Sequence, residues 1–201
     1  MKNNNLSILQ RGIIFLSGIL LVVVLFVPLW QIELVAPQYP EGLVLKMHPH
    51  KIAGNVDIIN GLNHYIGMKT LHTKDFIEFK ILPYIVGFFA LLSFIVAAQK
   101  RKKWLTVLFS LFVIFGIVAM VDFWRWEYAY GHDLNPEAPI QVPGMAYQPP
   151  LIGFKQLLNF GAYSIPDIGG WLFVVVGLLL LSALLISRKK KKSPELNKLN
   201  T

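Results

Sequence analysis

The chain of 201 residues contains no cysteine. This absence excludes disulfide bonds, thiolate metal sites, thioredoxin-type redox chemistry and covalent attachment of c-type haem. Charged residues are also scarce, at 15% of the chain, whereas hydrophobic residues make up 55%. That balance is too apolar for an ordinary soluble domain. An oxidising compartment is compatible with the sequence, because nothing in such a compartment requires cysteine.

Recognisable catalytic signatures are absent as well. The sequence has no G-x-S-x-G, H-E-x-x-H or P-loop pattern. Glu127 or Asp133 could pair with His132 as an acid and a base, but such neighbours arise easily by chance. The sequence therefore gives no support for an enzyme.

The most prominent feature of the sequence is a set of four long apolar runs. Nineteen residues of helix span about 28 Å, close to the hydrocarbon thickness of a bilayer. No run has a charged residue in its middle, and the first ends in Pro28-Leu29-Trp30 rather than in a signal-peptide cleavage site. We predict a mainly α, integral membrane fold with four transmembrane helices, at residues 12–30, 81–98, 104–122 and 170–187.

Cationic residues predict the orientation of these helices. The N-terminus, the 99–103 loop and the C-terminal tail contain 12 of the 19 lysines and arginines, and ten of the eleven acids lie on or beside the other two connections. The positive-inside rule then predicts an inner (cytoplasmic) membrane protein with cytoplasmic termini and long periplasmic loops. The basic tail would face membrane lipid, and no nucleic acid partner is expected. The predicted segments are cytoplasmic 1–11, 99–103 and 188–201, and periplasmic 31–80 and 123–169.

The two long loops carry different patterns. Alternation in the first predicts a small antiparallel β-sheet with strands at 31–35, 42–48 and 51–59, followed by a helix that Asn60 could cap. The second begins with aromatic residues, continues as a proline-rich strap over 135–150, and is expected to form a short helix over 151–162. The strap is expected to be ordered only if it packs on the first loop.

Residues 60–68, within the first loop, combine histidine, methionine, asparagine and glycine. Imidazole and thioether groups without thiols suit copper, especially Cu(I). His64 and Met68 would share one stripe of a helix, together with His72. We predict metal ligands at His64, Met68, His132 and Met145, in a site shaped by Asn60, Asn63, Tyr65 and Gly67. A second pair, His48 and His50, would lie on one face of an extended segment.

Other interpretations stay open. A buried His64 with a hydrogen bond inside its own loop is the commoner fate of such a residue. No haem is expected in the membrane, because the four runs contain no histidine. Trp124, Trp126 and Tyr128 leave an electron-transfer helper as a further, weaker alternative.

Both loops also resemble a known family. Residues 36–43 (APQYPEGL), 59–68 (INGLNHYIGM) and 130–140 (YGHDLNPEAPI) are similar to segments of small bacterial membrane proteins from gene clusters for nitrous oxide reductase and its copper maturation, chiefly of Bacteroidetes type. Residues 149–153, 155–156 and 159–160 fit the same pattern, so the resemblance covers about half of the chain. His64, Met68 and His132 match its motifs, whereas His48, His50 and His72 fall outside them.

The resemblance implies a periplasmic setting and an accessory role in denitrification. The expected function is copper handling or delivery to a periplasmic copper enzyme. Expected partners are a periplasmic copper protein, a copper-delivery lipoprotein or an ABC-type membrane complex. The alternative is a non-catalytic membrane scaffold that docks a periplasmic lipoprotein, transporter or reductase.

Overall fold

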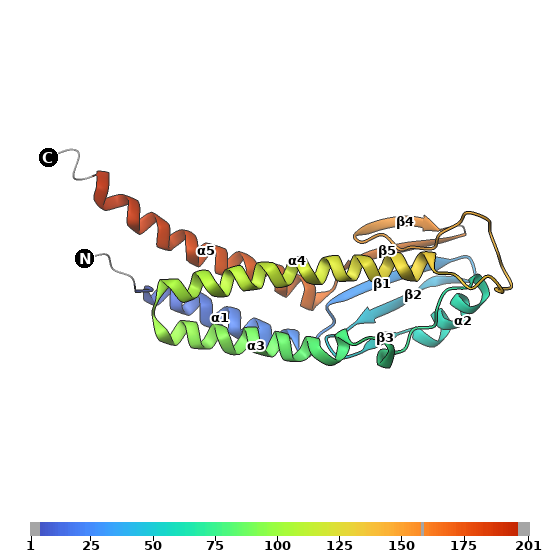
Figure 1. The fold of residues 1–201 in the computed structure, drawn as a ribbon, viewed down its shortest axis with the longest axis horizontal. Helices are drawn as coiled ribbons and strands as arrows, with labels where there is room; N and C mark the ends of the chain where they lie inside the picture. The colour runs from blue at the N-terminus through green and yellow to red at the C-terminus, as the bar shows by residue number, and fades with distance from the viewer. Residues whose placement is uncertain (1–4, 158, 197–201) are drawn as a thin grey trace.

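Four apolar helices form one end of the molecule and an antiparallel sheet forms the other (Figure 1). The computed structural model describes residues 5–157 and 159–196, so the predicted segments 1–11 and 188–201 lie partly outside the described residues. The bundle consists of α1 (Ile8–Val24), α3 (Glu78–Gln99), α4 (Lys102–His132) and α5 (Ile168–Leu196).

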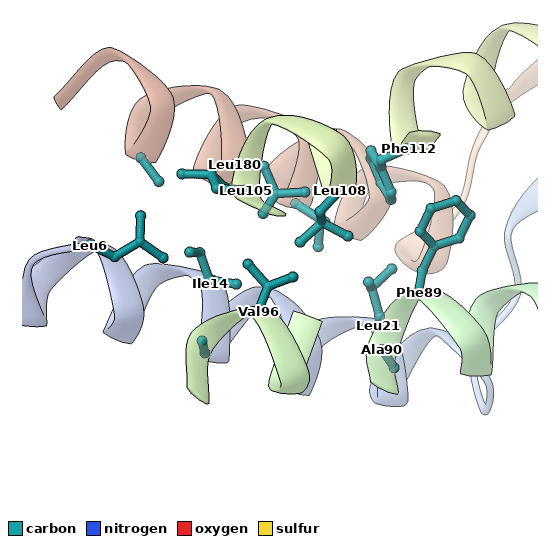
Figure 2. Close-up of a cluster of buried hydrophobic side chains, with 13 residues drawn as sticks. Leu6, Ile14, Leu21, Phe89, Ala90, Val96, Leu105, Leu108, Phe112 and Leu180 are labelled. Atoms are coloured by element: carbon teal, nitrogen blue, oxygen red, sulfur yellow. The ribbon is translucent and has the colours of Figure 1, made fainter. Parts of the chain in front are cut away.

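The interior of the bundle is mainly apolar. Ile14, Leu105, Leu108 and Leu180 are completely buried and point toward one another from α1, α4 and α5 (Figure 2). The outward faces of the same helices are also apolar, as expected where lipid replaces water. At the end away from the sheet, the buried Gln10 donates its side-chain amide to the Ala183 carbonyl at 2.7 Å, so this polar group is satisfied.

Three helices in the described part of the chain are long and apolar enough to cross a membrane: Glu78–Gln99, Lys102–His132 and the Ile168–Ile186 part of α5. The first helix is shorter than the predicted span 12–30, because it begins at Ile8, where Ser7 and Gln10 form a capping box, and ends at Val24. Pro28 disfavours helical geometry in the residue before it, and Trp30 already belongs to a strand.

Helix α4 is longer than the predicted span 104–122. Its 31 residues extend about 46 Å, well beyond a hydrocarbon layer of about 30 Å. No proline or other break follows Val121, so the helix continues through the aromatic residues to His132. This last part lies along the sheet (Figure 1).

The sheet is antiparallel, as predicted, but it has five strands drawn from both loops. Their order is β3-β2-β1-β5-β4. The central strand β1 pairs with its neighbour β2 and also with β5, where Ile32 lies opposite Ser164, 132 positions later. The strands are β1 (Trp30–Ala36), β2 (Tyr39–Met47), β3 (Ile52–Gly54), β4 (Gly153–Leu157) and β5 (Phe160–Pro166).

Three predictions for the loops were wrong. The strand expected over 51–59 stops at Gly54, and helix α2 (Val56–Ile66) follows directly. The helix expected over 151–162 is instead the hairpin of β4 and β5, because pairing with β1 decides the conformation of a segment with weak local preference. Asn60 does not cap α2, which begins after Asn55.

A second core lies between the sheet and the helices. We call it the sheet–helix core, and it is formed by Ile32, Leu43, Leu45, Ile59, Met68, Leu71, Tyr130 and Tyr147. These residues come from β1, β2, α2, the segment after α2, the end of α4 and the proline-rich strap. One face of the sheet is therefore packed, and the two long loops fold as one domain with the end of α4.

Candidate functional site

The strap and the 60–68 segment are packed on each other. The Gly67 carbonyl accepts a hydrogen bond from the Asn135 N–H at 2.8 Å, and the Tyr65 carbonyl accepts one from the Ile140 N–H at 2.9 Å. Gly67 ends α2 in the left-handed conformation with φ 80°, and a Cβ there would lie 2.9 Å from the Asn135 carbonyl oxygen. Only glycine combines an unstrained left-handed conformation with the absence of a Cβ at this position.

Two asparagines hold the chain after α2 in place. The Asn60 side chain accepts from the Leu71 N–H at 2.7 Å and donates to the Leu71 carbonyl at 3.0 Å. The side-chain amide of Asn63 is buried and donates to the Tyr130 hydroxyl and to the Lys69 carbonyl. Burial raises the pKa of the Tyr130 hydroxyl, which therefore stays protonated at physiological pH.

The four predicted metal ligands occupy two different environments. The two imidazoles are exposed: His64 lies on α2, and His132 stacks on Tyr128 at the end of α4 with ring centroids 4.0 Å apart. The two thioethers contact the sheet–helix core, in which Met68 is only 8% exposed and Met145 is half-buried. The expected stripe of His64, Met68 and His72 does not form, because α2 ends at Ile66.

One histidine pair does come together. The ring centroids of His48 and His50 lie 5.9 Å apart at the turn between β2 and β3. The buried Nδ1 of His48 has no hydrogen-bond partner within residues 5–157 and 159–196. Burial, followed by the charges of Lys51 and His50, lowers the pKa of His48. The signal in the sequence was the Met-His-Pro-His pattern, which brings two imidazoles together only because the chain turns there. No cluster of three or more histidines or acids suited to a metal occurs among the described residues.

The outer face of the sheet carries several exposed side chains. Side chains alternate along a strand, so the face opposite the sheet–helix core carries Glu33 and Val35 of β1 with Phe154 of β4 and Tyr163 of β5. Val35 is 52% exposed, Phe154 64% and Tyr163 41%. The ring of Phe154 covers Gly161, where a Cβ would approach it to 2.6 Å. Among the described residues no helix covers this face (Figure 1).

The end of α4 carries aromatic residues on two faces. Phe123, Trp126 and Tyr130 stack in succession toward the sheet–helix core, at centroid distances of 5.8 and 5.0 Å. Trp124, Tyr128 and His132 form an exposed row on another face. Sequence reasoning grouped Trp124, Trp126 and Tyr128 together, although the helix separates Trp126 from the other two.

The fold thus defines a class: a bundle of apolar, membrane-type helices that carries a small α/β domain at one end. No protein family model, no curated protein and no solved structure matches the chain.

Proposed function

We propose that the protein is a non-catalytic membrane scaffold that docks a partner protein on the outer face of its sheet. The observation that carries this proposal is the composition of that face. An antiparallel sheet with one open side normally exposes polar side chains there. Here Val35, Phe154 and Tyr163 are exposed on a face that also carries Glu33 and Lys46, and the opposite face of β1 and β2 is packed in the sheet–helix core. Aromatic residues on a preformed surface are typical of protein interfaces.

The proposal includes the four-span topology with a periplasmic domain. The distribution of charge supports it, and so does the geometry at the end of the bundle away from the sheet. The Leu6 N–H donates to the Lys100 carbonyl at 2.6 Å, so the start of α1 lies beside the basic 99–103 turn. The end of α5 lies toward the same end of the bundle (Figure 1). The expected partners are a periplasmic lipoprotein, a transporter or a reductase.

Site-specific photo-crosslinking in cells tests the docking face. A photoreactive amino acid at Tyr163 or Phe154 should give one discrete adduct, identified by mass spectrometry as a membrane or periplasmic protein. The same amino acid at Ile58, which is 40% exposed on α2, is the matched control. We expect at least tenfold less adduct there. Equal labelling at all three positions, or no adduct from the sheet, would argue against the scaffold.

Copper handling is the second candidate function, and His48 with His50 is the observation that favours it. Imidazoles bind metal in the neutral form, and the lowered pKa of His48 keeps its ring neutral at pH 7. The two ring centroids lie 5.9 Å apart, and imidazole is a ligand that suits copper. Copper handling ranks second because the charges of Lys51 and Lys46, which also lower this pKa, would oppose a bound cation.

A titration of the purified full-length protein with Cu(I), under reducing conditions and against a chelator, separates the copper sites. If the turn binds copper, His48→Ala/His50→Ala should weaken binding at least tenfold, whereas His64→Ala/Met68→Leu should leave it unchanged. The reverse result would favour the site predicted from the sequence. Absence of binding to the unaltered protein would end the copper proposal and leave the docking proposal intact.

A further inference from the structure

Glu127 is a completely buried acid in an apolar setting. It lies on α4 one turn beyond Phe123, whose ring contacts Trp30 at the start of β1 with centroids 5.2 Å apart. Glu127 is therefore at the level of the sheet, beyond the apolar span. Neither of its carboxyl oxygens has a hydrogen-bond partner among the described residues.

A carboxylate in such a place is costly. An ionised group without partners loses its hydration on burial and gains nothing in return, so it takes up a proton instead. Burial raises the pKa of the Glu127 carboxyl to about 8. A neutral carboxyl tolerates the apolar contact far better than a charged one does.

Within the described part of the chain, no charged group of the neighbouring elements bonds to the Glu127 carboxyl. The strap contributes Tyr147, whose N–H bonds to the Gly131 carbonyl one turn from Glu127. Its buried hydroxyl likewise has no hydrogen-bond partner in the described part of the chain. On α4 itself, Tyr130 is held by Asn63 of α2. Lys155 shares the packed face of β4 but donates to the Gln148 carbonyl at 3.1 Å. The sheet residues of the core from β1 and β2 are apolar, and Tyr39 borders that core from the far end of β2.

We propose that Glu127 is a proton-binding site in the interface between α4 and the sheet, which we call the joint. The carboxyl is neutral while α4 is packed on the sheet, and its deprotonation weakens this packing. The domain carries the docking face on the other side of the same sheet. The pH of the surrounding compartment would thereby control how firmly that face is held on the membrane helices. The consequence for docking rests on the proposed function, whereas the proton-binding site itself does not.

The sign of the pH effect follows from linkage. The folded state binds the proton more tightly than the unfolded state, so the stabilisation is complete below the ordinary glutamate pKa of about 4.5. It is lost as the pH rises toward about 8. The dependence of stability on pH can be measured by thermal unfolding of the full-length protein in lipid nanodiscs. Tryptophan fluorescence follows the unfolding at each pH from 5 to 9. We expect the Tm to fall by about 5 °C over this range.

Glu127→Gln should remove at least half of this fall, whereas Glu137→Gln, an exposed acid in the strap, should keep the wild-type profile. The proposal would be overturned if the Tm of Glu127→Gln fell with pH as steeply as that of the wild type, or if the wild-type Tm did not change with pH. If Glu127→Gln does not fold, Glu127→Met fills a similar volume without a titratable group and is expected to be insensitive to pH. If the Tm of Glu127→Met still fell with pH as in the wild type, the proposal would also be overturned.

Infrared difference spectroscopy gives an independent readout that a purely structural role would not produce. The wild type should show the carbonyl band of a protonated carboxylic acid at pH 6.5 that disappears by pH 9. Glu127→Gln should lack this band. If the wild type lacks it too, the carboxyl is ionised and the proposal fails.

Discussion

Gly131→Ala is expected to destabilise the protein by about 1–3 kcal/mol, because the strap leaves no space for a side chain at this point of α4. A Cβ on Gly131 would lie 2.3 Å from both the Cα and the backbone nitrogen of Gln148. These are backbone atoms, so the strap itself must move. Its movement would break the bond between the Tyr147 N–H and the Gly131 carbonyl and uncover the buried Tyr147 ring.

Gly116→Ala is the matched control for this change. It lies in the same helix, and a Cβ there would meet nothing within 4 Å. Since alanine favours a helix over glycine by about 1 kcal/mol, this variant should be neutral or slightly more stable. Thermal unfolding in detergent measures both effects, and hydrogen exchange should show faster exchange over 135–150 in Gly131→Ala alone. Equal stability of the two variants would mean that the strap does not pack on α4 as described.

Asn63→Leu is expected to cost about 2–3 kcal/mol, because it leaves buried polar groups without partners. The Asn63 amide donates both to the Tyr130 hydroxyl and to the Lys69 carbonyl, and this residue is 5% exposed. Leucine keeps the approximate volume but removes both donors. The bond joins α2 to the end of α4, so its loss should also accelerate proteolysis within 60–72.

A double-mutant cycle identifies the origin of this cost. Tyr130→Phe removes the other partner, and the double variant should be less destabilised than the sum of the two single variants by about 1 kcal/mol. Tyr65→Phe is the control, because its side chain is 55% exposed on the same helix, and it should change stability by less than about 0.5 kcal/mol. Strict additivity of Asn63→Leu and Tyr130→Phe would exclude the bond as the cause.

Local sequence patterns predicted some features of the candidate sites but not others. The residues expected to shape the 60–68 segment lie where they can do so: Gly67 ends the helix, and Asn60 bonds to the chain after it. The predicted alignment of His64, Met68 and His72 required a continuous helix through residue 72, and the left-handed Gly67 breaks that stripe. The pair at His48 and His50 depends on a turn held by the His48 N–H and the Lys51 carbonyl, which spacing alone does not reveal.

The apolar runs determined by themselves that the chain forms long, membrane-type helices, because hydrophobicity sustained over about 20 residues needs no distant partner to be interpreted. Local alternation similarly determined that residues 31–47 form paired strands. Only the tertiary structure decided that β5 joins β1, that α4 continues onto the sheet, and that Glu127 lies inside the joint. Each of these depends on segments far apart in the chain, whose mutual burial outweighs the weak preference of either segment alone.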